Sequence, residues 1–267
     1  MMRLNQATFS FSAELNDFLP AWQRGKVIHC EFQGNPSVKH LIESLGVPHT
    51  EVGRILVNGV ERDFSYWVQD GDCIEVYPLA NSGSEAPDGT TSELTCAVRF
   101  ILDNHLGRLA TYLRMLGIDV LYRNDYQDEE LACLAEAEQR ILLTRDRRLL
   151  MRSRVRRGYW VRAKVPRQQL IEILQRFDLA RSIGPFRRCI RCNALLQPIA
   201  KEKILDRLEP LTKKYYNEFH ICPRCHQIYW KGSHYERMQD FIRQVLAHVQ
   251  DGKNHDSVRL DELNEEI

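Results

Sequence analysis

Three carboxylates each follow an apolar run of the chain. Asp103 ends RFILD, Asp128 comes after IDVLYR, and Asp146 ends ILLTRD. Such runs are typical of buried parallel strands, whose carboxyl ends meet at one edge of a sheet. Clustered carboxylates repel one another and are normally neutralised by a cation, and carboxylates with water suit Mg²⁺ or Mn²⁺. The sequence therefore predicts a divalent-metal site formed by Asp103, Asp128 and Asp146.

Each of these acids also has a structural interpretation that needs no metal. Asp103 can turn the chain or cap a helix, and Asp128 can open a helix as its N-cap. Asp146 can cap a short helix that starts at Arg147. The metal interpretation depends on the occurrence of all three acids at the same edge.

Arginines surround the last of these acids. The basic residues next to it and after it are Arg145, Arg147, Arg148, Arg152, Arg154, Arg156 and Arg157. The planar guanidinium suits phosphate, and a metal ion beside it can activate water for attack on a phosphodiester. We expect Arg145, Arg147 and Arg148 to bind substrate phosphate, and about half of the arginines to pair with surface acids instead.

Two further polar residues are candidates for the same site. Arg108, one helical turn after Asp103, is expected to reach substrate phosphate, unless it lies on a solvated helix face. Thr144, two residues before Asp146, is expected to hydrogen-bond a carboxylate or water of the site, or else to satisfy the end of a strand.

Two CxxC pairs form a second set of candidate ligands. They contain Cys189, Cys192, Cys222 and Cys225. Four thiolates suit a tetrahedral Zn²⁺ with bonds of about 2.3 Å and leave no position for a reactive water. The spacing therefore predicts structural zinc rather than a redox or free-thiol role. His220 and His226 flank the second pair and are the substitutes if one cysteine is not a ligand.

Aromatic residues alternate with basic ones around the second pair. They are Tyr215, Tyr216, Tyr229 and Trp230, among Lys213, Lys214, Arg224 and Lys231. Rings in basic surroundings can stack on unpaired bases of single-stranded RNA. A small zinc ribbon must also bury rings around its metal, so both roles are open for each ring.

The net charge of +1 hides an uneven distribution. Residues 96–250 hold 29 Lys and Arg against 17 Asp and Glu, whereas residues 1–80 hold 6 against 10. The basic segment indicates a polyanionic partner such as nucleic acid, or else a solvated basic face. No apolar run approaches the roughly 20 residues of a membrane span, and the first residues lack the pattern of a signal peptide. We therefore expect a cytoplasmic protein.

The elements that position the acids follow from the periodicity of apolar residues. RFILD, IDVLYR, RILLT and YWVRA are expected strands, and they alternate with helical patterns near Leu106, Asp128 and Pro166. Gly117 is expected to stop the first of these helices. Alternation of this kind predicts an α/β domain with a parallel sheet flanked by helices.

The first 80 residues predict a separate small α+β domain. TFSFSAEL alternates as a strand does, VKHLIESLG has helical spacing, and Asn58-Gly59 is a signal for a two-residue hairpin turn. Residues 81–95, rich in Gly, Ser, Thr and acids, are an expected linker.

The segments LGVPHTEVGRILVNG and DGDCIEVYP resemble the ubiquitin-like β-grasp domains related to sulfur-carrier proteins. The resemblance implies a β-grasp fold. Those carriers act through a C-terminal Gly-Gly, whereas this chain reads YPLANSGSE and continues. A docking or structural role is therefore expected in place of carrier chemistry.

The acid-bearing segments resemble another family. Residues 97–240, notably FILDNHLGRLATYLRMLGIDVLYRNDYQDEELACL and ILLTRDRRLL, look like the PIN-like ribonuclease domain at the C-terminus of the Mut-seven exonuclease family, which precedes a zinc ribbon. The resemblance implies that Asp103, Asp128 and Asp146 match the metal-binding acids of that family. Active sites of this kind often hold four acids, and the candidates for the fourth are Asp125, Glu129 and Glu130.

The expected organisation follows from these patterns. It comprises a β-grasp domain at 1–80, a linker at 81–95, a PIN-like domain at 96–182, a zinc ribbon with a C-terminal helix at 183–250, and an acidic tail at 251–267. The expected activity is Mg²⁺- or Mn²⁺-dependent hydrolysis of RNA, single-stranded or structured. The alternative is a catalytically weak RNA-binding adaptor. A third interpretation, a sulfur-transfer accessory protein, is supported by the β-grasp resemblance alone. A protein partner is a further expectation for the β-grasp domain.

Overall fold

The fold is described from a computed structural model that covers residues 4–80 and 98–264, with side chains to residue 250. The expected linker at 81–95 lies outside the described residues. The chain divides into two compact units. One contains the N-terminal domain and Tyr126–Trp160, and the other contains residues 98–125 and the chain from Val161 onward. Among the described residues, no helix has both the length and the apolar character needed to cross a membrane.

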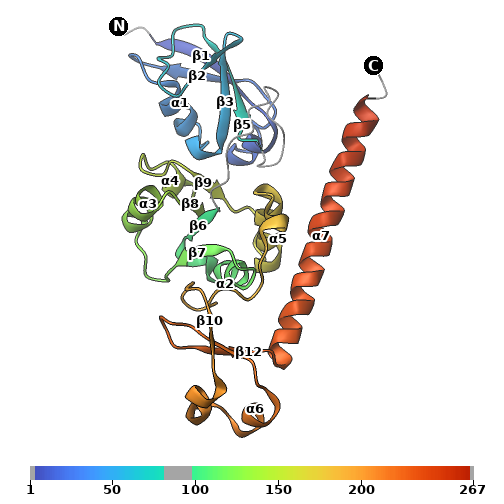
Figure 1. The fold of residues 1–267 in the computed structure, drawn as a ribbon. Coiled ribbons are helices and arrows are strands. Elements are labelled where there is room, and N and C mark those ends of the chain that lie inside the picture. The colour runs from blue at the N-terminus through green and yellow to red at the C-terminus, as the bar shows by residue number, and fades with distance from the viewer. Residues whose placement is uncertain (1–3, 81–97, 265–267) are drawn as a thin grey trace. The chain divides into compact units, whose positions relative to one another are not determined.

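The N-terminal domain is a mixed sheet with one α-helix (Figure 1). Its elements are β1 (Asn5–Phe11), the 3-10 helix η1 (Ala13–Phe18), β2 (Ile28–Phe32), α1 (Val38–Ser44), the 3-10 helix η2 (His49–Glu51), β3 (Val52–Val57), β4 (Val60–Arg62) and β5 (Cys73–Pro78). The strand order is β2-β1-β5-β3-β4. β1 and β5 pair in parallel, whereas β1 with β2, β3 with β4 and β3 with β5 pair antiparallel. This arrangement confirms the predicted β-grasp domain.

Local sequence signals explain the main features of this sheet. Ala7, Phe9 and Phe11 alternate on the buried face of β1, as the period of two requires. Asn58 and Gly59 join β3 to β4 with φ values of 51° and 78°. Positive φ at both central residues is the requirement of the tight hairpin turn that Asn-Gly favours, so the predicted hairpin is confirmed.

The second sheet has four strands in the order β7-β6-β8-β9 (Figure 1). Its elements are β6 (Arg99–Leu102), the 3-10 helix η3 (Asn104–Leu106), α2 (Gly107–Met115), β7 (Asp119–Tyr122), α3 (Asp128–Ala137), β8 (Ile141–Thr144), α4 (Arg147–Leu150), β9 (Gly158–Trp160), α5 (Pro166–Arg176) and the 3-10 helix η4 (Leu179–Ser182). β6 pairs with β7 and β8 pairs with β9, both in parallel. The predicted α/β domain with a parallel sheet is therefore confirmed.

The end of α2 shows why the chain turns where it does. Leu109, Ala110 and Leu113 are buried at helical spacing. Gly117 follows the helix with a φ of +84°, and a Cβ at this position would lie 2.1 Å from the carbonyl oxygen of Gly184. Only glycine fits both the left-handed conformation and the close approach. Gly117 thus ends the helix as predicted.

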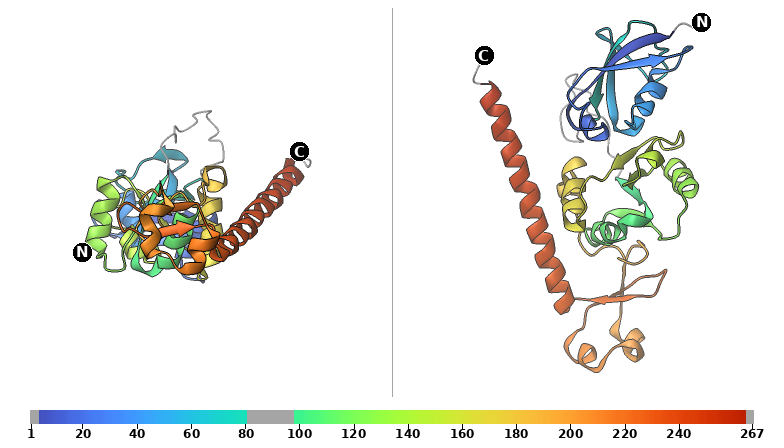
Figure 2. Two further views of the ribbon diagram at one scale, coloured as in Figure 1. Left: turned by 60° about the horizontal axis from the view of Figure 1, so that its bottom comes forward. Right: turned by 180° about the vertical axis from the view of Figure 1, so that it is seen from behind.

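The C-terminal elements form a small antiparallel sheet and a long helix. They are β10 (Gln197–Ile199), the 3-10 helix η5 (Lys201–Arg207), α6 (Pro210–Tyr215), β11 (Phe219–Ile221), β12 (Ile228–Trp230) and α7 (Ser233–Asn264). The helix α7 begins just after β12 and runs beside α5 (Figure 2). The ring of Phe241 in α7 lies 4.7 Å from that of Tyr112 in α2, measured between centroids. The helix extends through much of residues 251–267, where a tail was expected.

Arg147 joins the N-terminal domain to the segment Tyr126–Trp160. Its guanidinium donates to the carbonyl oxygens of Phe18 at 2.9 Å and Asp17 at 3.1 Å. The same group lies 5.1 Å from the ring centroid of Phe18 and 4.1 Å from that of Trp160. Cation–π contacts and charge-assisted hydrogen bonds reinforce each other here. These contacts differ from the phosphate contact that the sequence predicted for Arg147.

Two further contacts attach the N-terminal domain to the segment Tyr126–Trp160. The backbone N–H of Trp160 donates to Oε1 of the buried Glu51 at 2.6 Å. His49 lies between Glu43 Oε1, 2.6 Å from its Nδ1, and the carbonyl oxygen of Val155, 2.9 Å from its Nε2. The N-terminal domain therefore docks on β9 and on the turn that precedes it.

Replacing Arg147 with methionine should loosen this docking. Arg147→Met removes both hydrogen bonds to backbone carbonyls and the cation–π contacts, which together contribute about 2–4 kcal/mol. We expect faster hydrogen exchange in peptides that cover Asp17–Phe18 and Gly158–Trp160, and a lower denaturant midpoint. Arg148→Met, which changes the exposed neighbour of Arg147, is the matched control. Equal exchange in the two variants would contradict the docking role of Arg147.

Candidate functional site: a four-cysteine centre and the acids of the parallel sheet

Two tight turns bring the four predicted cysteines together. In the first turn, the Cys189 N–H donates to the Ala194 carbonyl, and the Asn193 N–H donates to the Cys189 carbonyl. In the second turn, the Cys222 N–H donates to the Gln227 carbonyl, and the His226 N–H donates to the Cys222 carbonyl. Asn193 and His226 occupy the same place, four residues after the first cysteine, with φ values of 71° and 57°. His226 thus serves the turn, because Asn and His tolerate the left-handed conformation better than most residues.

The four sulfur atoms have the separation that a tetrahedral ion needs. Cys189 Sγ lies 3.5 Å from Cys225 Sγ, and Cys192 Sγ lies 3.3 Å from Cys222 Sγ. All four lie within 4.8 Å of one another. Sulfurs bound to Zn²⁺ at about 2.3 Å stand about 3.8 Å apart in a tetrahedron. The cluster therefore fits structural zinc, and the predicted ligand set of four cysteines is the one that the fold assembles.

Hydrogen bonding prepares one of these thiols for metal binding. Burial opposes ionisation of Cys189, but a hydrogen bond from the Tyr229 hydroxyl and others from the backbone outweigh it and lower the pKa of Cys189 to about 7. Burial raises the pKa of Cys192 to about 12. Burial also raises the pKa of Tyr229, together with its 3.1 Å hydrogen bond to Cys189 Sγ, so its hydroxyl stays protonated as a donor. Zinc binds thiolates, so binding must displace the proton of Cys192.

A buried arginine attaches the first cysteine turn to the parallel sheet. The guanidinium of Arg114 is 4% exposed and donates to the carbonyl oxygen of Val120 at 3.0 Å. It also donates to the carbonyls of Ile190 at 3.3 Å and Arg191 at 2.9 Å, which lie between the first two cysteines. No local pattern in the sequence indicates this role, because the acceptors lie 6 to 77 residues away from Arg114.

Asn193 makes a second link between the same parts. Its side chain accepts a hydrogen bond from the backbone N–H of Val120 at 3.0 Å and donates to Asp119 Oδ1 at 2.9 Å. Asp119 also pairs with Arg188 at 3.2 Å. One residue therefore both turns the chain around the metal cluster and docks that turn on β7.

Two of the predicted catalytic acids cap helices. Asp103 follows β6 directly, is 5% exposed, and its Oδ1 accepts from the Asn104 N–H at 2.6 Å. Asp146 follows β8 by two residues, and its Oδ1 accepts from the Arg148 N–H at 2.8 Å, which makes it the N-cap of α4. Both acids therefore cap helices, as the alternative without a metal predicted. In each of them, Oδ1 makes the cap hydrogen bond.

The other acids have arginine partners or lie in the first turn of α3. Asp128 is the first residue of α3, whose N-cap is Gln127, and its Oδ2 lies 3.4 Å from Arg152. Asp125 accepts two hydrogen bonds from Arg123, at 2.9 and 2.6 Å. Glu130 also lies in the first turn of α3. The N-cap interpretation of Asp128 is wrong by one residue, because Gln127 has the extended conformation of the cap.

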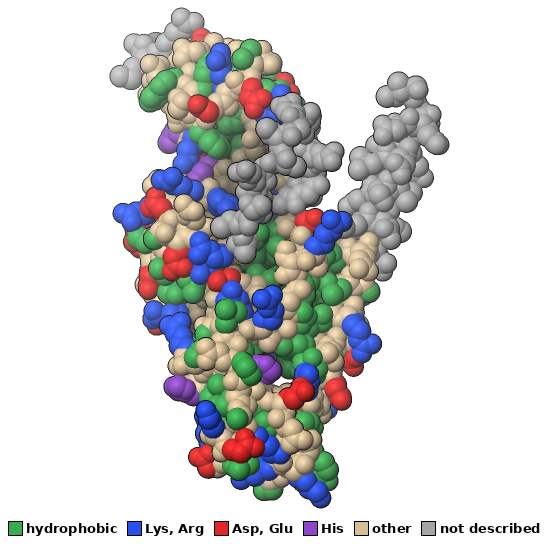
Figure 3. All heavy atoms as spheres, viewed as in Figure 1, with side chains coloured by type: hydrophobic (Ala, Val, Ile, Leu, Met, Phe, Trp, Pro, Cys, Tyr) green, Lys and Arg blue, Asp and Glu red, His purple; other side chains and the backbone are tan. Residues whose placement is uncertain are grey.

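Some of the arginines near these acids pair with other carboxylates, and others do not. Arg152 pairs with Glu129 at 2.7 Å, Arg154 with Glu129 at 3.9 Å, and Arg156 with Glu136 at 3.4 Å. Within the described residues, Arg108, Arg145 and Arg148 make no side-chain ion pair. Basic and acidic side chains are accordingly interspersed on the face in Figure 3.

Thr144 orients the residue that follows it. Its side chain is fully buried, and its Oγ1 accepts a hydrogen bond from the backbone N–H of Asp146 at 2.9 Å. No second group of three or more His, Cys, Asp or Glu ligand atoms lies as close together as the cysteines in the part of the chain that the structure describes. A metal ion shared by Asp103, Asp128 and Asp146 therefore stays a prediction.

Removal of one cysteine should release the structural metal. We expect one Zn²⁺ per purified chain by elemental analysis and less than half of this content in Cys222→Ser, because three thiolates bind zinc much more weakly than four. The thermal unfolding temperature should fall with the metal content. The control Cys73→Ser changes an exposed cysteine of β5 and should keep its zinc. Full zinc in Cys222→Ser would contradict the assignment.

Comparisons with known proteins agree with both parts of the fold. A family model described as the Mut7-C RNAse domain matches residues 98–242, more than half of the chain, and one described as Mut7-C ubiquitin matches residues 4–83. Comparison with curated proteins finds no match, and comparison with solved structures finds none either. The matched region contains the parallel-sheet acids and all four cysteines, and it indicates a nuclease with a nucleic-acid substrate. The chain belongs to the Mut7-C RNAse domain family, with a Mut7-C ubiquitin domain in front of the RNAse domain.

Proposed function

We propose that this protein hydrolyses RNA phosphodiester bonds with the help of Mg²⁺ or Mn²⁺ bound by Asp103, Asp128 and Asp146. The match to the Mut7-C RNAse domain carries the proposal. It is supported by Asp103 and Asp146, which follow β6 and β8 of one parallel sheet. Ligands of such sheets bind beyond the carboxyl ends of the strands.

The local contacts of these acids are compatible with a metal ion. A carboxylate has two oxygens and about four acceptor sites, so the single cap bond of Asp146 leaves capacity for a cation. Asp128 and Arg152 form an exposed pair at 3.4 Å. Exposed pairs of this kind contribute only about 0–1 kcal/mol, so a divalent ion can replace the arginine. Asp125 and Glu130 stay candidates for a fourth acid.

The chain's own residues would then bind and orient the substrate. A bound ion would supply a water of lowered pKa and neutralise charge on the phosphate. Arg108, Arg145 and Arg148 are the proposed phosphate-binding residues, since Arg147 is engaged by Phe18 and Asp17. Thr144 would hold Asp146 in place through the hydrogen bond to its backbone N–H.

A catalytically weak RNA-binding adaptor is the second candidate function. It is favoured by the present partners of the acids, since Asp103 and Asp146 cap helices and Asp128 pairs with Arg152. Such a protein would bind RNA and leave it intact with either metal.

A cleavage assay separates the two candidates. We expect the full-length protein to cleave labelled single-stranded or structured RNA when Mg²⁺ or Mn²⁺ is added, and not without it. Asp146→Asn and Asp103→Asn should each lower the rate about 100-fold or more, because loss of a catalytic ion removes several kcal/mol of transition-state stabilisation. RNA binding should change little in either variant.

Two controls sharpen this assay. The metal is withheld by dialysis rather than by a chelator, because a chelator also removes zinc from the cysteines. Asp206→Asn, in an exposed acid of η5, should keep wild-type activity. Bound but uncut RNA at every metal concentration would establish the adaptor, and equal rates in Asp206→Asn and Asp146→Asn would show that Asp146 is not catalytic.

A further inference from the structure

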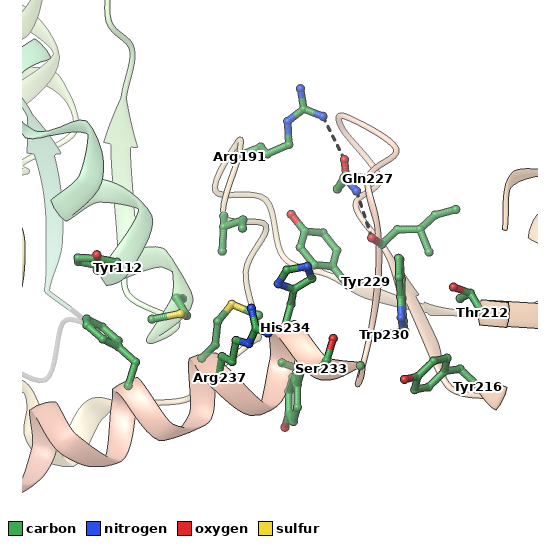
Figure 4. Close-up of a pocket in the computed structure, with 17 residues that line it drawn as sticks. Tyr112, Arg191, Thr212, Tyr216, Gln227, Tyr229, Trp230, Ser233, His234 and Arg237 are labelled. Carbon is green, nitrogen blue, oxygen red and sulfur yellow. Dashed lines mark hydrogen bonds between the residues drawn. The ribbon is translucent and has the colours of Figure 1, made fainter. Parts of the chain in front are cut away.

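A cavity of about 710 Å³ lies between the cysteine turns, the end of α2 and the start of α7 (Figure 4). Its volume is within the range of about 300–1,000 Å³ that is usual for ligand pockets. The elements around it all belong to the unit that contains the chain from Val161 onward. The cavity is separate from the acids of the proposed catalytic site, since none of them lines it.

The chemistry of the walls restricts the ligand. Aromatic and aliphatic side chains supply most of the surface, and the basic residues that line it are Arg191, His234 and Arg237. None of the described residues that line the cavity is Asp or Glu. A cationic ligand would meet only positive charge there, whereas an aromatic ligand that carries negative charge complements both the rings and the arginines.

The rings that line the cavity differ in how far their neighbours cover them. The Tyr229 hydroxyl is bound to Cys189, and the ring of Tyr112 is covered by Phe241 at 4.7 Å. Trp230 lines the cavity and is 39% exposed, and the half-buried Tyr216 lines it too. Figure 4 shows Trp230 and Tyr216 on one side of the cavity and Tyr112 on the other, with His234 between them.

The rings of Trp230 and Tyr216 lie against the backbone of Gly232. A Cβ on Gly232 would lie 2.9 Å from Trp230 Nε1 and 3.5 Å from the Tyr216 hydroxyl oxygen. The indole therefore lies against a backbone that has no side chain, and any larger residue at 232 must displace it. At the rim, Arg191 donates to Gln227 Oε1 at 3.0 Å, which orients its guanidinium and leaves most of its five donors for a ligand.

We propose that this cavity binds one unpaired nucleotide of single-stranded RNA, with the base stacked on Trp230 and the phosphate held by Arg191 and Arg237. The proposal rests on the proposed ribonuclease function for its RNA substrate, and it adds a substrate-binding site outside the acids. Unpaired bases stack on aromatic rings, whereas bases inside a duplex are not accessible to them. The site therefore selects single-stranded over double-stranded RNA.

Binding of fluorescein-labelled oligouridylate by the full-length, zinc-loaded protein tests this site. Trp230→Leu should weaken binding about tenfold, as expected for the loss of one stacked base. Binding of a labelled RNA duplex should not change. Tyr215→Leu is the matched control, because Tyr215 is an aromatic residue next to Tyr216 in sequence that is 64% exposed and does not line the cavity.

Two further variants separate this site from other causes. Gly232→Ala keeps every ring and should still weaken oligouridylate binding several-fold, which covers the case in which Trp230→Leu does not fold. Arg237→Gln should reduce the salt dependence of binding by about one counterion. Wild-type binding by a zinc-loaded Trp230→Leu or Gly232→Ala protein would overturn the proposal, and so would an equal loss in Tyr215→Leu.

The outcomes distinguish this proposal from the ribonuclease function. Weakened oligouridylate binding in Trp230→Leu together with uncut RNA supports the nucleotide site and rejects the catalytic role. Unchanged binding in Trp230→Leu together with metal-dependent cleavage that Asp146→Asn abolishes rejects the nucleotide site and supports the nuclease. In that case the cavity takes a ligand other than RNA.

Discussion

A guanidinium group carries five N–H donors and a permanent charge, so it can be buried only where several acceptors surround it. The buried Arg114 meets this requirement with carbonyl oxygens of β7 and of the first cysteine turn. The half-buried Arg147 contacts carbonyl oxygens of η1 and two aromatic rings. In both cases the acceptors are distant in sequence. Loss of Arg114 would leave buried carbonyl oxygens without their donor, which is costly. These two side chains therefore hold the cysteine centre on the parallel sheet and the N-terminal domain on β9.

The second of these attachments lies next to the proposed chemistry. Asp146 caps α4, and Arg147 is the first residue of α4. The acid that is proposed to bind metal is therefore followed directly by the arginine that binds the N-terminal domain. A shift of the N-terminal domain would act on the start of α4 and hence on the backbone of Asp146, which Thr144 also holds. The β-grasp domain lacks the terminal glycines of a sulfur carrier, and its contacts with Arg147, Trp160 and Val155 are structural.

The four cysteines likewise lie next to the proposed nucleotide-binding cavity, and β12 contributes to both. Tyr229 and Trp230 are adjacent residues of β12, and both line the cavity. The hydroxyl of Tyr229 reaches Cys189, whereas the ring of Trp230 lies 6.4 Å from that of Phe219, measured between centroids. A zinc ion bound by the four cysteines would thereby stabilise the strand that carries the exposed indole. Gly232 and α7 follow within a few residues and complete the wall. The short segment from Cys189 to the start of α7 thus combines metal binding, attachment to the parallel sheet and part of an aromatic cavity.

The sequence by itself determined the elements whose causes are local. The strand and helix periods, the Asn58-Gly59 turn, the stop at Gly117, the cap at Asp146 and the two CxxC pairs all depend on residues a few positions apart. Only the tertiary structure decided the partners of long side chains. Arg147 could reach phosphate or a carbonyl, and Arg152 could reach substrate or Asp128, because such side chains are flexible and their neighbours come from distant segments. The cavity, too, arises only where α2, β12 and α7 meet. Its rings were recognisable in the sequence as candidates for stacking, but which of them stays exposed depends on the packing of all three elements.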